Sequence, residues 1–192
     1  MDINRHGIKV PRTESEGQAA RAARALLING AREVGRKFTH PEDDWHPIWA
    51  VLTQDQGTII ETGAREANDP RAKTKITQYV ADFARRRGAI AIGSLMSTWQ
   101  VILDVEKLGE QRVREIERQV RAQDGSTEGI EGRVERLLVI TYTAGNVESQ
   151  HAPINRHDNA PPTLGEFAAT SDLDHLEGRM TEPLQEALRR IG

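Results

Sequence analysis

Apolar residues in the first forty positions recur with the spacing of a helix. They stand three or four positions apart from Ala19 to Phe38, and arginines occupy the other faces of the same segment. Thr13-Glu14-Ser15-Glu16 has the T-x-x-E form of a capping box, in which hydroxyl and carboxylate each accept an otherwise unpaired backbone N–H. The spacing therefore predicts a helix over residues 14–36. Residues 1–12 show no periodicity, and we expect them to form a flexible arm.

Runs of alternating or continuous apolar residues predict about five strands. Residues 48–53 and 58–62 flank a polar turn and predict a hairpin. The long apolar run over 89–103 predicts a strand covered on both faces, or two strands bent at Gly93-Ser94. Residues 134–142 and 147–154 flank a second turn and predict another hairpin.

Helical signals also appear between and after these strands. Asp69-Pro70 starts a helix that ends at Gly88, and a short helix closes the chain with Leu184, Leu188 and Ile191 as its apolar edge. Residues 104–133 are dominated by charge and predict a mostly exposed helix. The order α-β-β-α-β-(charged insert)-β-β-α indicates an α+β fold with one mainly antiparallel sheet and flanking helices. We expect a single domain over 13–192, with a charged insertion at about 104–133.

Composition removes several function classes. The 192 residues include no Cys, which excludes disulfides, thiolate nucleophiles and the Cys-ligated zinc of the deaminases. The net charge of −3 gives no bulk electrostatic reason to bind nucleic acid. Without a signal-peptide core or a membrane-length apolar run, we expect a cytoplasmic protein that does not enter membranes. Arg provides 21 of the 26 basic residues, a codon bias typical of a GC-rich prokaryote or its phage.

A loop rich in His and Asp is the candidate site for chemistry. Imidazole and carboxylate groups bind divalent transition metals, and a second His-containing segment follows the last predicted hairpin. If these two segments lie close together in space, they would form the site of a metal-dependent hydrolase. If they do not, the first segment is a solvated loop whose Asp residues cap turns. Trp45 and Trp49 flank the first loop, which makes it the place to look for a small-molecule site. The candidate metal ligands are His40, Asp44, His46, His151 and His157.

Two surfaces are candidates for binding macromolecules. Val113, Ile116 and Val120 form a narrow apolar edge on the charged helix, suited to a partner helix, to self-association or to packing on its own domain. Arg85-Arg86-Arg87 ends the second helix, where it complements the helix dipole and would also suit phosphate contacts.

No catalytic or nucleotide-binding signature has the required spacing. The chain lacks H-E-x-x-H, G-x-S-x-G, the P-loop and G-x-G-x-x-G. The leading hypothesis is therefore a non-catalytic protein-interaction or accessory protein without a cofactor, acting on a protein partner or on itself. The metal-dependent hydrolase is the second hypothesis and nucleic-acid binding through the basic helix is the third, so enzymatic activity stays open at this point.

Overall fold

A computed structural model describes residues 3–63, 70–101, 103, 105–123, 127–170 and 181–189. Within them, antiparallel pairing joins the strands in the order β1-β3-β2-β4-β5-β6-β7, and β8 also pairs with β6. The strands are β1 (Ile3–Lys9), β2 (Ile48–Leu52), β3 (Gln56–Thr62), β4 (Ala91–Val101), β5 (Arg133–Tyr142), β6 (Val147–Asn155), β7 (Thr163–Leu164) and β8 (Ala168–Ala169). The helices are α1 (Glu16–Gly35), α3 (Pro70–Arg87), α4 (Val105–Leu108), α5 (Glu110–Ala122) and α6 (Thr181–Leu188).

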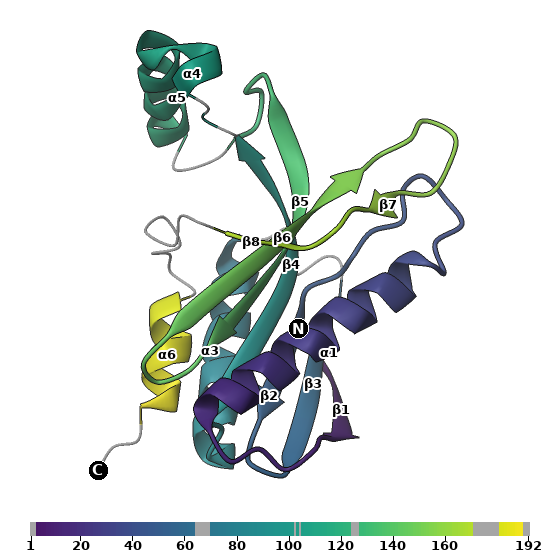
Figure 1. The fold of residues 1–192 in the computed structure, drawn as a ribbon, viewed down its shortest axis with the longest axis vertical. Helices are drawn as coiled ribbons and strands as arrows, with labels where there is room; N and C mark the ends of the chain where they lie inside the picture. Colours follow the sequence, from purple (N-terminus) through teal and green to yellow (C-terminus); the bar gives the residue numbers. More distant parts are fainter. Residues whose placement is uncertain are drawn as a thin grey trace.

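The prediction of about five strands is wrong, because the curled sheet has eight (Figure 1). The additional strands lack the burial pattern on which sequence reasoning depends. Residues 3–9, expected as part of a flexible arm, pair along their whole length with β3, but most of their side chains are exposed. β7 and β8 have two residues each, too few to show a period. Backbone pairing therefore recruits these strands, with limited core packing by Ile3 and Leu164.

The expected first helix is confirmed as α1, but a different residue caps it. Ser15 is the N-cap, and its hydroxyl accepts from the Gln18 backbone N–H at 3.3 Å. The side chain of Gln18 in turn accepts from the Glu14 N–H at 2.7 Å. Thr13 is buried instead, and its N–H donates to the Gln54 carbonyl at 2.7 Å. Thr13 thus ties the start of the helix to the β2–β3 turn.

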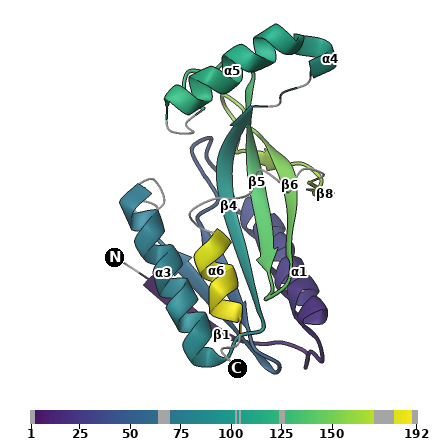
Figure 2. The same ribbon diagram turned by 90° about the vertical axis from the view of Figure 1, so that its left-hand side faces the viewer.

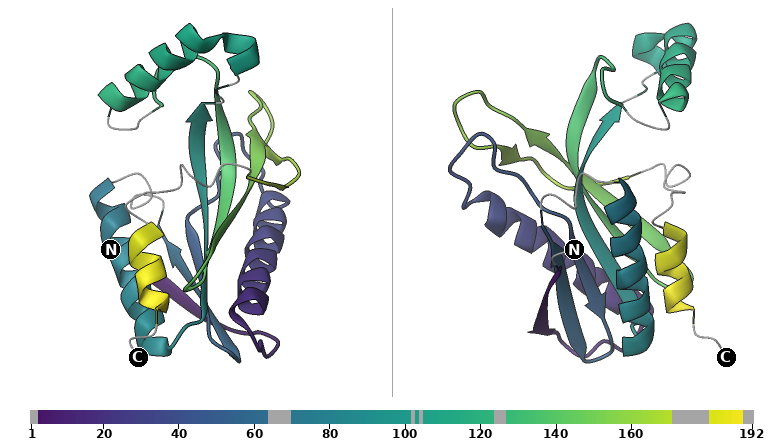
Figure 3. Two further views of the ribbon diagram at one scale, coloured as in Figure 1. Left: turned by 60° about the vertical axis from the view of Figure 1, so that its left-hand side comes forward. Right: turned by 180° about the vertical axis from the view of Figure 1, so that it is seen from behind.

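Helices cover both faces of the sheet (Figure 3). α1 packs on one face through Ala23, Leu27 and Ala31, whereas α3 and α6 pack on the other around Ile76, Val80 and Leu184. Trp49 belongs to the α3 side and its neighbour Ala50 to the α1 side, as strand alternation requires. The cap Asp69 and the edge residue Ile191 lie outside the described residues. Among the described residues, no helix is both long enough and apolar enough to cross a bilayer.

β4 is one continuous strand, which decides between the two readings of its apolar run. Gly93 marks a close approach of α1 and not a break in the strand. A Cβ at this position would lie 2.7 Å from Leu27 Cδ1 and 3.2 Å from Ala23 Cβ. The absent side chain lets the helix lie directly on the strand.

β4 and β5 extend beyond their neighbours in the sheet. β2 reaches only as far as Leu95 and β6 only as far as Arg136, while the β4–β5 ladder continues to Val101. The extended ladder carries α4 and α5 away from the sheet and its covering helices (Figures 1 and 2). We call this part of the chain, residues 97–101, 103, 105–123 and 127–135, the projection.

Candidate functional site

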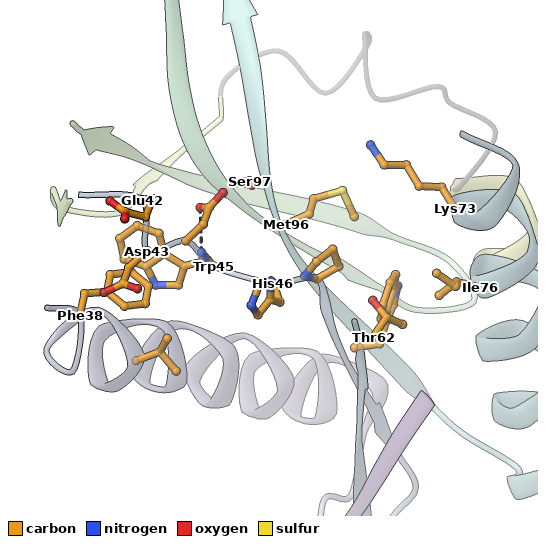
Figure 4. A pocket seen from close by; sticks show the side chains of 14 residues that line it. Phe38, Glu42, Asp43, Trp45, His46, Thr62, Lys73, Ile76, Met96 and Ser97 are labelled. Atoms are coloured by element: carbon orange, nitrogen blue, oxygen red, sulfur yellow. Dashed lines mark hydrogen bonds between the residues drawn. The ribbon is translucent and has the colours of Figure 1, made fainter. Parts of the chain in front are cut away.

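A cavity of about 540 Å³ lies at the fork where β2 begins beside the longer β4. It extends from Val34 and Phe38 at the end of α1 to Lys73 and Ile76 near the start of α3. The loop over 42–47 forms one wall of the cavity (Figure 4). Met96 and Ser97 also line the cavity, at the point where β4 continues beyond the first residue of β2. The two tryptophans of the predicted site, Trp45 and Trp49, both line this cavity.

Trp45 anchors the loop wall. Its side chain is buried, its indole N–H donates to the Ala31 carbonyl at 2.8 Å, and its ring meets Phe38 edge-on with centroids 4.6 Å apart. A Cβ on Gly35 would come within 2.8 Å of Trp45 Cζ2. The last turn of α1 therefore needs a glycine here to admit the indole ring.

Asp43 fixes the turn that precedes Trp45. Its Oδ2 accepts from the backbone N–H groups of Thr39 at 2.7 Å and His40 at 2.8 Å. The hydrogen bonds from His40 and Thr39 lower the pKa of the Asp43 carboxyl below its usual value. This side chain is therefore ionised at neutral pH and contributes negative charge to the loop end of the cavity.

Arg156, which the sequence did not single out, joins this loop to the sheet. It forms a bidentate pair with Glu135, with both nitrogen-to-oxygen distances at 2.7 Å, and donates to the Asp43 carbonyl at 2.8 Å. A further ion pair reaches Asp44 at 3.1 Å. The segment after β6 thus meets the His-rich loop as hypothesised, but through an arginine. Since the pairing spans 21 residues along the chain to Glu135 and 113 to Asp43, no local pattern could have shown it.

The structure does not bring the five candidate metal ligands together. Among the described residues, no group of three or more His, Cys, Asp or Glu side chains could hold a metal ion. Asp44 and His46 line the cavity, whereas His40 lies exposed on the turn outside it. His151 on β6 and His157 beyond it lie 3.1 Å from the Thr170 hydroxyl and 3.3 Å from the Thr163 hydroxyl. His151 and His157 therefore each contact a threonine hydroxyl and not another of the candidate metal ligands.

Two buried polar groups on the cavity lining have no hydrogen-bond partner in the described part of the chain. They are the indole N–H of Trp49, a residue that is 2 % exposed, and the hydroxyl of Thr62, which is 5 % exposed. Trp49 pairs with Ile60, and Thr62 lies two residues further along the same strand, so both side chains belong to one face. Sequence reasoning missed Thr62 because a threonine at a strand end is unremarkable without its partner across the sheet.

The apolar edge of the charged helix is not available to a partner. Val113 and Ile116 are buried and Val120 is half-buried, which matches packing within the chain itself. The exposed apolar side chains of the projection are others: Trp99 at 44 %, Leu103 at 37 % and Leu108 at 39 % exposure. Sequence reasoning missed Trp99 because it sits in a run that reads as a strand buried on both faces.

The basic end of α3 lies at the opposite end of β4 from the projection. Arg85, Arg86 and Arg87 are all exposed. Arg85 pairs with Asp82 at 3.0 Å, and the guanidinium of Arg87 lies 5.6 Å from the centroid of the Phe83 ring. Two of the three arginines thus contact their own helix, an arrangement expected of a solvated helix end.

Comparison of the chain with protein-family models, with curated proteins and with solved structures found no match.

Proposed function

We propose that this chain is a non-catalytic protein-interaction or accessory protein that contacts a protein partner through the projection. The concentration of exposed apolar side chains there carries the proposal. Trp99, Leu103 and Leu108 are three of the four large apolar residues that are exposed in the described part of the chain, and they fall within ten positions. Apolar residues gathered on a protruding element are typical of a binding surface.

The chemistry around Trp99 supports a contact centred on this residue. The Arg133 guanidinium lies 4.4 Å from the centroid of its ring. Tryptophan and arginine are the residues most enriched among those that dominate binding energy, and a stacked pair presents a rigid, amphipathic face. The partner that fits has an apolar pocket for the indole, bordered by carboxylates that accept from Arg133.

Charges elsewhere on the projection are largely paired among themselves. Arg114 contacts Glu110 at 3.1 Å, and Arg112 contacts Glu115 at 2.8 Å and Glu131 at 3.9 Å. Because exposed pairs of this kind contribute little energy, the outer face of α5 suits the rim of an interface and not its centre. The same proposal places the protein in the cytoplasm of a GC-rich prokaryote or its phage, on its arginine bias and lack of cysteine.

Site-specific photo-crosslinking in cells of the source organism tests this proposal. The photoreactive residue p-benzoylphenylalanine is introduced at Trp99 in one variant and at Arg86 in a matched control on the basic surface. We expect a discrete cross-linked protein at position 99 that is absent at position 86. Titration of that purified partner should then show about tenfold or greater loss of affinity for W99A and none for R86A. Cross-linking at position 86 alone, or equal affinities for both variants, would refute the assignment.

Self-association through the same surface is distinguished by sedimentation. If the partner is a second copy, wild-type protein dimerises at micromolar concentration and W99A does not. A monomeric wild type together with a heterologous cross-link assigns the surface to another protein.

A further inference from the structure

Two residues that line the cavity, Trp49 and Thr62, carry buried hydrogen-bond donors without a partner among the described residues. An indole N–H can only donate, and a buried donor left unpaired costs free energy that a bound acceptor would recover. Trp49 and Thr62 offer two such groups on one face of adjoining strands. This end of the cavity is therefore built to receive a group with acceptor oxygens.

Charge of opposite sign stands at the two ends of the same cavity (Figure 4). Lys73 comes from α3, as does Ile76, and its ammonium favours an anionic acceptor at this end of the cavity. Glu42 and Asp43 lie at the loop end with Phe38 and Trp45. Asp44 is already paired with Arg156, and Asp43 Oδ2 accepts from the Thr39 and His40 N–H groups. The Glu42 carboxylate and the second oxygen of Asp43 are left to attract a cation.

Apolar side chains line the cavity as well. Met96 lies between the two charged ends in Figure 4, and Pro47 and Trp49 also contribute to the lining. The cavity volume of about 540 Å³ lies within the roughly 300–1,000 Å³ typical of small-molecule sites. A ligand that satisfies all three regions has a carboxylate, an apolar stem and an ammonium group.

We propose that this cavity binds a small zwitterionic organic ligand, with its carboxylate toward Trp49, Thr62 and Lys73 and its ammonium group toward Glu42 and Asp43. The site shares only Ser97 with the projection and does not depend on the function proposed for it. Binding pairs both buried donors, and the low exposure of Trp49 and Thr62 strengthens those hydrogen bonds by excluding water.

Three matched probes test each part of the proposal: 8-aminooctanoate carries both charges, octanoate only the carboxylate and octylamine only the ammonium group. The chain has three tryptophans, so its indole N–H groups give three assignable NMR signals. Trp99 lies on the projection, outside the cavity lining, so its signal serves as the internal control. We expect 8-aminooctanoate to shift the Trp49 signal saturably and to bind more tightly than either single-ended probe.

Two variants separate binding from folding. T62V keeps the side-chain shape and removes the unpaired hydroxyl, so the free protein should be as stable as wild type or more so, while affinity for 8-aminooctanoate falls about threefold to tenfold. K73M should weaken binding by up to about fivefold, and K75M, a change of the same kind at the exposed Lys75 outside the cavity lining, should not.

Three results would overturn the proposal. One is the lack of a saturable Trp49 shift with any probe. Another is parallel movement of the Trp99 signal, which indicates non-specific association. The last is octanoate or octylamine binding as tightly as 8-aminooctanoate, which would show that one charged end contributes nothing.

Discussion

Replacement of Arg156 by methionine should be one of the most destabilising single changes near the cavity. Methionine keeps an unbranched apolar stem but removes the guanidinium that pairs with Glu135, Asp44 and the Asp43 carbonyl. The side chain of Glu135 is only 6 % exposed, so the variant leaves a desolvated carboxylate without its cation. Hydrogen bonding to Glu135 raises the pKa of Arg156 above its already high value, which keeps the guanidinium charged in the native protein.

The magnitude follows from the exposure of each partner. Breaking a buried ion pair by removing one member costs about 3–5 kcal/mol. Arg156 itself is 32 % exposed, so water partly compensates Glu135 once the guanidinium is gone, and we expect about 2–4 kcal/mol from this pair. The more exposed contact with Asp44 adds less than about 1 kcal/mol. The total of about 3 kcal/mol is a large part of the roughly 5–15 kcal/mol that stabilises a typical domain.

Urea unfolding followed by circular dichroism measures this loss as a lower midpoint at unchanged slope. R112M is the matched control, because both carboxylates facing Arg112 are at least half exposed and its loss should cost less than about 1 kcal/mol. The double variant E135L/R156M should recover much of the stability, since apolar replacement of both partners removes the unpaired charge. Equal losses for R156M and R112M would refute the reasoning, as would a double variant less stable than R156M.

Two further predictions concern packing and pH. G35A should lower the free energy of unfolding by up to about 2 kcal/mol, because its Cβ would lie 2.8 Å from the buried Trp45 ring. G30A has open space around its Cβ and should raise the free energy of unfolding by about 0.5–1 kcal/mol. Urea midpoints that move in the same direction for both variants would contradict this. Burial, helped by the charge of Arg136, lowers the pKa of His151 below 6.5, so the unfolded chain binds the proton more readily. The stability that this residue contributes is complete above about pH 6.5 and is lost as the pH falls toward the pKa of the folded protein. The difference in urea midpoint between wild type and H151Q should therefore change below pH 6.5. A constant difference would show that His151 does not contribute to the pH dependence of stability.

The elements that the sequence predicted well are those with a strong period or clear end signals. α1, α3 and the strands β2 to β6 agree closely with the expected segments, since each buries an apolar stripe or face. β1 escaped prediction because most of its side chains are exposed and it is held mainly by backbone pairing with β3. The charged insertion at about 104–133 was recognised from composition, and α5 lies within it. Its spacing left open whether the apolar edge packs on a partner or on its own domain, and the burial of Val113 and Ile116 agrees with packing within the chain.

In the candidate site too, local features could be predicted from the sequence, whereas contacts between distant residues could not. Local clustering of Trp45 and Trp49 around a polar loop was enough to indicate where a cavity lies. The bond between Arg156 and Glu135, the unpaired hydroxyl of Thr62 and the approach of Lys73 depend on strands and helices that meet only after folding. The sequence alone determined the helices, the central strands and the location of the aromatic loop, because local periodicity and turn chemistry act over a few residues. Only the tertiary structure decided strand order, separated the histidines and set charges at both ends of one cavity, because these depend on which distant segments share a face.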